Sequence, residues 1–543
     1  MSRFVRASKY RHVYGHTGKK EFSIDNIKIS NQAWDTNLAA ASAEYLSVNW
    51  ASAGGGAFAI LPLPTPWGTA PHDLPYKLPD IIPLARGHTA PVLDTSWSPF
   101  NDSVVASGGE DGNILIWKVE SHQFDGWATE HWQPIDFDPV QRFDASPRKI
   151  GQVLFHPTAS HVLASATGEH IVKIWDLGNV DNGPRSILGG HTDTIQSLDF
   201  DPSGTLLVTT CRDRKIRLFD PRAGGDAVRT VEGHGGIKGA RVVWMGDTGR
   251  IATTGFSKMS DRQLSIWDSG TLANIKTLSI DQSAGVTMPF WSDNGILFLA
   301  GKGDGNVRYY EYEADALHPL SEYKSSDPQR GMCFLPRRAL NVAECEIARA
   351  FKITTTTSSG TIEPIAFVVP RKADSFQADI FPPAPSLEPS VDAAEFFASR
   401  KEIVRRVVDL NTGTTSASTG PLTLVPPTVP YTSDSLSAVT PITPSPLVPK
   451  SATLGSSTLS SSFTTSAPTP TSGGLAQATF SSSFKPTATQ EYSVESDLSA
   501  LADENARLNG ELREARSQIR SLELQLEAMR ANAQRAAKVL LDN

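Results

Sequence analysis

The feature that most constrains the fold is a unit that recurs along the chain. Five stretches each place an acidic residue six positions before an aromatic residue. The successive aromatic residues are 58, 44, 48 and 43 positions apart. A period of this length indicates neighbouring copies of one supersecondary unit, because a single unit cannot bury its apolar face alone. The five pairs are Asp111 and Trp117, Glu169 and Trp175, Asp213 and Phe219, Asp261 and Trp267, and Asp304 and Tyr310.

The repeats carry the signature of a WD-repeat β-propeller, an all-β fold with four strands per blade. In that family the acidic residue lies in a tight turn and joins a hydrogen-bonded relay. The relay runs through the histidine of a Gly-His pair and a strand hydroxyl to the indole N–H. A structural role for these residues is favoured over a catalytic triad. The expected members are His88, Ser107, Asp111 and Trp117, then His191, Thr209 and Asp213, then Asp261 and Trp267.

Seven blades are expected, five from the plain repeats and two from degenerate ones. EYLSVNWASAGGGAFAILPL precedes the repeats, and GMCFLPRRALNVAECEIARAFKI with IEPIAFVVP follows them. The last blade has room for about three strands, and an open ring would expose sheet edges. We therefore expect SKYRHVYG, with alternating side chains from Tyr10 to Tyr14, to supply the closing outer strand. FSIDNIKISN should then start the first blade, with Ile27 and Ile29 on one face and Lys28 on the other.

Composition divides the rest of the chain. Residues 411–490 contain 46 Ser, Thr and Pro among 80, and Asp434, Lys450 and Lys485 are their only charged residues. Such a segment cannot bury enough apolar surface to offset its ordering entropy, so a disordered linker is predicted. The chain has three cysteines, an odd number, and no two of them are separated by only two residues. This argues against a disulfide framework and against a zinc site. No apolar run approaches membrane-spanning length.

The C-terminal segment has a heptad pattern over six heptads, which predicts an α-helical coiled coil. A helix packed on a domain is the alternative, but the linker leaves no adjacent domain. Asn505 at an a position favours a dimer in many zippers, whereas Ile519, Leu522 and Glu523 partly match a trimer-specifying pattern. A parallel trimer is preferred and a dimer stays open. The oligomerisation residues are Leu498, Leu501, Asn505, Leu508, Leu512, Ile519, Leu522, Glu523 and Leu526.

Several stretches resemble the coronin family: KYRHVYG, TTGFSKMSDRQLSIWD, DPQRGMCFLPRRALNVAECEIARAFK and PIAFVVPRKADSFQADIFPP. The resemblance implies an actin-filament-binding protein of the cytoplasm and actin cytoskeleton, at the cell cortex or in actin patches. It also implies partnership with the actin-related protein 2/3 complex and with cofilin. The family's filament-contacting basic residue matches Lys28, with Lys19 and Lys20 as weaker candidates, and an ordinary solvated lysine is the competing interpretation of Lys28.

The expected layout is a propeller at 1–370, a C-terminal extension packed on it at 371–409, a linker at 410–494 and a parallel coiled coil at 495–543. The expected function is to cross-link or bundle actin filaments and to regulate branched nucleation and turnover. An oligomeric propeller scaffold for trafficking or substrate recognition, without actin binding, is the alternative. We find no P-loop, HExxH, GxSxG or metal-ligand spacing, so no enzyme and no cofactor are expected. A net charge of −8 argues against nucleic acid as a partner.

Overall fold

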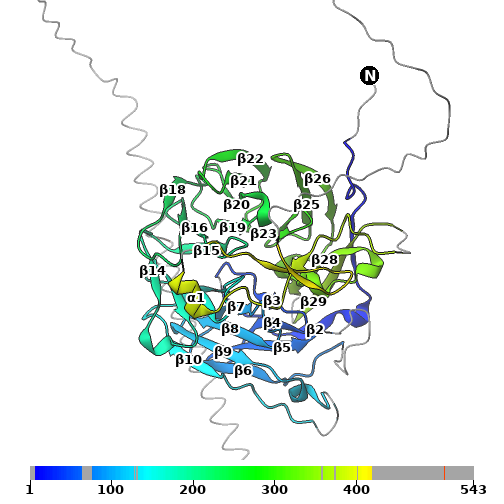
Figure 1. Cartoon of the computed structure of the whole chain (residues 1–543). Helices are drawn as coiled ribbons and strands as arrows, with labels where there is room; N and C mark the ends of the chain where they lie inside the picture. Colours follow the sequence, from blue (N-terminus) through cyan, green and yellow to red (C-terminus); the bar gives the residue numbers. More distant parts are fainter. Residues whose placement is uncertain are drawn as a thin grey trace, which may run out of the picture. The chain divides into compact units, whose positions relative to one another are not determined.

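The computed structural model describes residues 6–418, except 33, 64–75, 128, 130–131, 356–358, 372–374 and 400, and residue 507. Within this part, seven antiparallel sheets stand side by side around a central axis (Figure 1), and in six of them all neighbouring strands are consecutive in the chain. An eighth, three-stranded sheet lies in the C-terminal extension. The fold is therefore a seven-bladed β-propeller, as the repeats predict.

Six blades have four strands each, and their strands follow chain order from the inside of the ring outward. The first blade holds β3 (Ala39–Ala41), β4 (Tyr45–Trp50), β5 (Gly56–Pro62) and β6 (Leu84–His88). The second holds β7 (Val92–Trp97), β8 (Val104–Gly109), β9 (Asn113–Lys118) and β10 (Gln141–Asp144). The third holds β11 (Ile150–Phe155), β12 (Val162–Thr167), β13 (Val172–Asp176) and β14 (Ser186–Leu188).

The next three blades repeat this order. The fourth holds β15 (Ile195–Phe200), β16 (Leu207–Cys211), β17 (Lys215–Phe219) and β18 (Arg229–Glu232). The fifth holds β19 (Arg241–Trp244), β20 (Arg250–Phe256), β21 (Arg262–Asp268) and β22 (Asn274–Asp281). The sixth holds β23 (Thr287–Ser292), β24 (Ile296–Gly301), β25 (Val307–Glu313) and β26 (Ala316–Tyr323). Short 3-10 turns occur at Lys20–Phe22, Ser121–Phe124, Val180–Asn182, Gly246–Thr248, Arg337–Ala339 and Val342–Glu344.

The seventh blade closes the ring with the N-terminal segment. It holds β27 (Gln329–Phe334), β28 (Glu346–Thr355) and β29 (Gly360–Val368), and β1 (Tyr14–Thr17) pairs antiparallel with the outer side of β29. The same edge of β29 also pairs with β2 (Ile24–Ile27). The expected closure by the N-terminus is therefore present, and it removes an exposed sheet edge.

Two details of the N-terminal prediction are wrong. The closing strand begins at Tyr14, because Tyr10 to Val13 form a turn in which Val13 N–H donates to the Tyr10 carbonyl at 3.0 Å. This turn buries the side chains of both Tyr10 and Val13, which a regular strand would place on opposite faces. In addition, β2 belongs to the seventh blade instead of the first, because it pairs with β29.

Buried polar side chains join neighbouring blades near the axis. Asp94 on β7 accepts a hydrogen bond from Val153 N–H of the third blade at 3.1 Å, and Asp199 on β15 accepts one from Trp244 N–H of the fifth at 2.7 Å. The side chain of Gln152 bonds both the N–H and the carbonyl of Leu198, at 3.0 and 3.2 Å. Burial raises the pKa of both aspartates to about 7.

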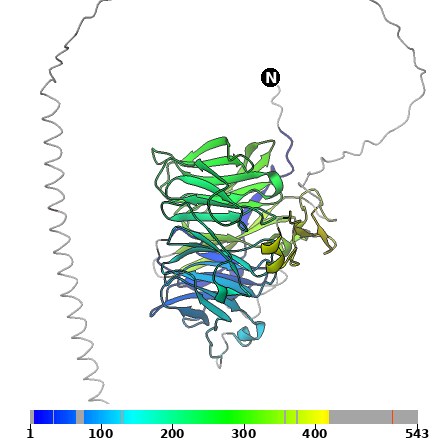
Figure 2. The same cartoon turned by 60° about the vertical axis from the view of Figure 1, so that its left-hand side comes forward.

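The C-terminal extension packs across one face of the ring, where it is drawn in yellow in Figures 1 and 2. Ile380 and Phe381 are buried in the core of the sixth and seventh blades. Helix α1 (Ala393–Ala398) is capped by Asp392, which accepts from Glu395 N–H at 2.7 Å, and it buries Phe396 against the third and fourth blades. The extension thus packs on the propeller, as expected.

The extension is longer than predicted. β30 (Ala384–Pro385), β31 (Arg406–Val408) and β32 (Thr415–Ala417) form its own sheet. The predicted linker at 410–494 therefore starts too early, because the β31–β32 hairpin needs Thr415 to Ala417 as its second strand. The remainder of the predicted linker, from 419, lies outside the described residues.

Candidate functional site

The relay predicted for the repeats is complete in the second blade. Trp117 Nε1 donates to Ser107 Oγ at 2.9 Å, and Ser107 Oγ lies 2.8 Å from His88 Nε2. His88 Nδ1 lies 3.0 Å from Asp111 Oδ1. A neutral His88 with its proton on Nδ1 satisfies every link of this chain. His88 ends the outer strand of the first blade, so the relay fastens that blade to the second.

The acidic end of the relay is held by several donors. Thr89 N–H and Asn113 N–H donate to the Asp111 carboxylate at 2.8 and 3.1 Å. Burial acts to raise the pKa of Asp111, but the hydrogen bonds from His88 and these amides outweigh it and lower the pKa well below its usual range. Because every polar group is occupied by a protein partner, the arrangement is a structural tie with no nucleophile available to a substrate.

The relay is shortened in the fourth blade. His191 Nε2 lies 2.9 Å from Thr209 Oγ1, but Phe219 replaces the tryptophan and cannot donate. The Arg217 guanidinium donates two hydrogen bonds to the Asp213 carboxylate, at 2.6 and 3.1 Å. His191 Nδ1 is consequently buried without a hydrogen-bond partner in the described structure. The expected link from His191 to Asp213 is therefore absent here, because the arginine competes for the carboxylate.

The fifth blade corrects another expected member. Trp267 Nε1 donates to Thr253 Oγ1 at 2.7 Å, and Thr253 Oγ1 lies 2.9 Å from His234 Nε2. Asp261 instead accepts from Ser257 Oγ at 3.0 Å within its own turn, and no hydrogen bond joins it to His234 in the described structure. The sequence interpretation missed Thr253. Thr253 lies 14 positions before Trp267, whereas Ser107 lies 10 positions before Trp117 in the second blade, so the two spacings differ by four residues.

The predicted contact residue Lys28 lies on the surface where the seventh blade meets the first. Ile27 and Ile29 beside it are 1% and 6% exposed, whereas Lys28 is exposed. Its Nζ donates to the backbone carbonyl of Asp80 at 2.8 Å. The Asp80 carboxylate is turned to Asn26 Nδ2 at 3.0 Å. Lys28 is thus oriented by a neutral backbone acceptor, and among the described residues no carboxylate lies within 4.0 Å of its ammonium group.

A β-bulge produces this orientation. The pairing of β2 with β29 skips Asn26, whose φ is +68°, between Asp25 and Ile27. The extra residue lets Ile24 and Ile27 both face the core although they are three positions apart. A Cβ at Gly360, opposite Ile27, would lie 2.3 Å from Ile29 Cδ1, so the close approach here requires glycine.

Further cations surround Lys28. Lys19 and Lys20 are exposed, and Lys20 Nζ lies 5.2 Å from the centre of the Tyr76 ring. Lys77, which the sequence interpretation missed, is exposed and its backbone bridges to Asp25 in β2. The signal for Lys77 is weak, because it lies some fifty residues away in the chain and only the fold brings it to this edge. We call Lys19, Lys20, Lys28 and Lys77 the basic edge.

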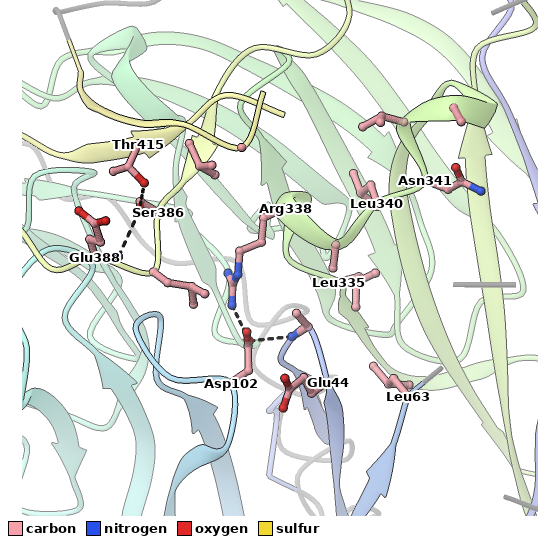
Figure 3. A pocket seen from close by; sticks show the side chains of 17 residues that line it. Glu44, Leu63, Asp102, Leu335, Arg338, Leu340, Asn341, Ser386, Glu388 and Thr415 are labelled. Carbon is pink, nitrogen blue, oxygen red and sulfur yellow. Dashed lines mark hydrogen bonds and ion pairs between the residues drawn. The ribbon is translucent and has the colours of Figure 1, made fainter. Parts of the chain in front are cut away.

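A pocket of about 860 Å³ lies between the extension and the propeller, as Figure 3 shows. Arg338 points to Asp102 at its floor, and Asp102 also accepts from Ala43 N–H at 2.8 Å. Leu335 and Leu340 line one wall. The Asp102 carboxylate and the Arg338 guanidinium neutralise each other. In the described parts of the chain, no three His, Cys, Asp or Glu side chains group together as metal ligands.

The predicted oligomerisation residues lie outside the described residues. They are Leu498, Leu501, Asn505, Leu508, Leu512, Ile519, Leu522, Glu523 and Leu526. Across the described residues, no helix is long and apolar enough to cross a membrane.

Three family models match four parts of the chain. One described as a domain of unknown function (DUF1899) covers residues 3–66. The WD domain, G-beta repeat, matches residues 82–118 and 182–220, and a type of WD40 repeat matches residues 362–402. These matches agree with the propeller and with its N-terminal closing segment.

Known proteins share this architecture. The coronin-like protein crn1 of Schizosaccharomyces pombe is 48% identical over 413 residues, which are 76% of this chain and 65% of that relative's length. Coronin-A of Dictyostelium discoideum is 42% identical over 400 residues, which cover 73% of this chain and 84% of that protein. The crystal structure of the WD40 domain of Toxoplasma gondii coronin aligns with a TM-score of 0.64 and 29% identity, over 74% of this chain and 98% of that one. The chain therefore belongs to the coronin family.

Proposed function

We propose that this protein is a non-enzymatic, multivalent actin-filament organiser. Its membership of the coronin family carries the proposal, and the exposed basic edge around Lys28 supports it. An acidic filament surface is the expected complement of such an edge, which acts through steering and register more than through raw affinity. Coupling to the actin-related protein 2/3 complex and to cofilin, and a place at the cell cortex or in actin patches, follow as part of the same proposal.

Several heads per molecule are needed because one head binds weakly. Exposed charge pairs contribute about 0 to 1 kcal/mol each, so one propeller with four surface lysines should hold a filament loosely. The heptads at 495–543 would join two or three propellers, and the linker would give each one reach. Cross-linking and bundling then arise from the assembly.

Filament co-sedimentation tests the site. Lys28→Asp should weaken binding of the full chain, most clearly at low ionic strength, because it reverses a charge that faces solvent. Lys276→Asp is the matched control, since Lys276 is an exposed lysine on the outer strand β22 of the fifth blade. Both variants should keep the wild-type melting temperature. Equal binding by the wild type and Lys28→Asp would place the filament contact elsewhere on the propeller.

A further inference from the structure

A second charged site lies on the propeller face that the extension leaves uncovered. The extension contacts turns between the first and second strands of blades, such as Asp247 and Asp293, which both receive Arg405. Segments that join one blade to the next lie at the opposite ends of the same strands, because neighbouring strands are antiparallel. A pocket of about 460 Å³ is lined mainly by such joining segments, including Lys149 and Lys238. We call it the cationic pocket.

One wall of the cationic pocket is an aromatic side chain from a distant part of the chain. Trp34 lies in the segment between β2 and β3, and its Nε1 donates to the Gly151 carbonyl of the third blade at 2.7 Å. The Lys149 ammonium lies 3.9 Å from the centre of the Trp34 ring. A Cβ at Gly151 would lie 2.6 Å from that ring, so glycine is needed for this contact. Contacts with Gly151 and Lys149 at the start of the third blade therefore hold the Trp34 ring in place, and this wall of the pocket is preformed.

The lining is strongly cationic although the whole chain is acidic. It contains Lys149, Arg212, Lys238 and Arg241 against one carboxylate, Asp35. Among the described residues neither Lys149 nor Lys238 has a carboxylate within 4.0 Å, and both ammonium groups lie over aromatic rings instead.

The two arginines are also incompletely neutralised. Arg212 lies 4.0 Å from Asp193, and both side chains are about half exposed, so this pair contributes little. Arg241 is 8% exposed and donates to the Asp35 carbonyl and to Asn37 Oδ1, yet its buried Nε has no acceptor in the described structure. The pocket thus keeps a surplus of positive charge.

Apolar side chains stand beside these cations. Ile237, which lines the pocket, is 70% exposed, and Met259 in the adjacent turn is 86% exposed. The two turns touch, because a Cβ at Gly235 would lie 2.9 Å from Lys258 Cγ. Exposed apolar residues within a charged surface are typical of protein-binding sites and are unnecessary for binding a phosphate backbone.

We propose that the cationic pocket binds an acidic peptide segment of a partner protein. One or two carboxylates would lie among Lys149, Arg212 and Lys238, and an apolar side chain would pack on Trp34 and Ile237. The volume suits a few side chains and excludes a folded domain. Asp35 in the lining disfavours a long polyanion such as nucleic acid. This inference goes beyond the proposed filament function and does not depend on it.

Fluorescence anisotropy with the full chain tests the proposal. The probe is a labelled heptapeptide, Glu-Asp-Glu-Leu-Asp-Glu-Asp. The competitors are the unlabelled peptide, its lysine-substituted counterpart and an oligothymidine of equal charge. We expect saturable binding that Lys149→Glu, Arg212→Glu and Lys238→Glu together weaken by about tenfold or more. Ile237→Ser should weaken it by about threefold or more, which a purely electrostatic contact would not do.

A matched control variant separates the effect of the pocket residues on peptide binding from the effect of the protein's net charge. Lys276→Glu, Arg229→Glu and Lys401→Glu change the charge equally at exposed positions outside the pocket, and they should leave peptide binding unchanged. Equal weakening by this control would overturn the proposal. So would absent saturation by the acidic peptide, or stronger competition by the oligothymidine than by the unlabelled peptide.

Discussion

The hydroxyl of Tyr309 donates a hydrogen bond of 3.0 Å to the backbone carbonyl of Val13, across 296 positions of the chain. Tyr309 lies on β25 of the sixth blade, and Val13 immediately precedes the strand that closes the seventh. The N-terminal segment is therefore fastened to two blades, through this bond and through the pairing of β1 with β29. Its integrity should control the stability of the whole ring.

Tyr10 provides the sharpest test of that closure. Its ring is fully buried in the same core as Ile380 of the extension, and its hydroxyl has no hydrogen-bond partner in the described structure. Tyr10→Ala should lower the free energy of unfolding by about 3 to 5 kcal/mol, because it leaves a large cavity. Tyr10→Phe should be neutral or stabilising, since it removes an unsatisfied buried hydroxyl.

Thermal unfolding followed by circular dichroism distinguishes the two variants. A deletion of residues 1–15 should lower the melting temperature as well, because it removes Tyr10, Val13 and the start of β1. If the deletion variant melted like the intact protein, the N-terminal segment would not be needed to close the ring.

The relays predict a graded loss of stability. Ser107→Ala removes the partner of both His88 and Trp117, and should cost about 3 kcal/mol because two buried polar groups lose their hydrogen bonds. Thr209→Val removes the partner of His191 alone, so it should cost about half as much. Chemical unfolding monitored by tryptophan fluorescence measures the free energy of unfolding of each variant and so ranks the two losses of stability. Equal costs would show that the indole link contributes nothing to stability.

His156 predicts a pH dependence. It lies under α1, where its ring is 4.3 Å from Phe396, its Nδ1 accepts from Ala159 N–H at 2.8 Å, and its Nε2 bonds the Gly204 carbonyl at 2.9 Å. Burial lowers its pKa to about 3. The unfolded chain therefore binds a proton below about pH 6.5 that the folded protein does not, so His156 destabilises the fold progressively as pH falls toward 3.

A variant without the titrating group isolates this effect. His156→Asn should melt below the wild type at pH 7, because it replaces a packed ring, and the difference between the two melting temperatures should narrow as the pH is lowered to about 4. A difference that stays constant or widens would mean that His156 can be protonated in the folded protein.

The repeats made the ring predictable, because each acid–aromatic pair reports a local turn between two adjacent strands. Predictions from the sequence were wrong where packing or a competing side chain overrides a local pattern. The alternation from Tyr10 to Tyr14 fits a strand, but burial of both Tyr10 and Val13 forces a turn and moves the strand to Tyr14–Thr17. Likewise, Asp213 has the spacing of a relay acid, yet Arg217 four positions later captures it.

The candidate contact surface was only partly predictable for the same reason. The exposure of Lys28 follows from local alternation with Ile27 and Ile29. Lys77 joins the basic edge only through pairing of its segment with β2. The cationic pocket brings together Trp34, which precedes the first blade, and Lys238, which follows the fourth. Non-local convergence of this kind leaves no periodic trace in the sequence.

We propose that filament organisation needs several propellers in one assembly. The predicted linker of about eighty residues would span about 50 Å on average if it follows the scaling of flexible chains, and it would then let linked heads sample neighbouring subunits or a second filament. After one head binds, binding of the next is intramolecular, and avidity can exceed single-head affinity by about a hundredfold or more. Leu512→Asp with Ile519→Asp would place charges at two a positions of the predicted coiled coil and should break its core.

The most direct measurement compares the full chain, this double variant and residues 1–418 in high-speed and low-speed co-sedimentation with actin filaments, with light scattering to confirm the mass of each. We predict that the full chain binds tightly and bundles filaments, whereas the double variant is monomeric, keeps the wild-type propeller melting temperature, and matches residues 1–418 in binding weakly without bundling. A confirmed monomer that bundles filaments as well as the wild type would contradict the account and would require a second filament-binding site within a single chain.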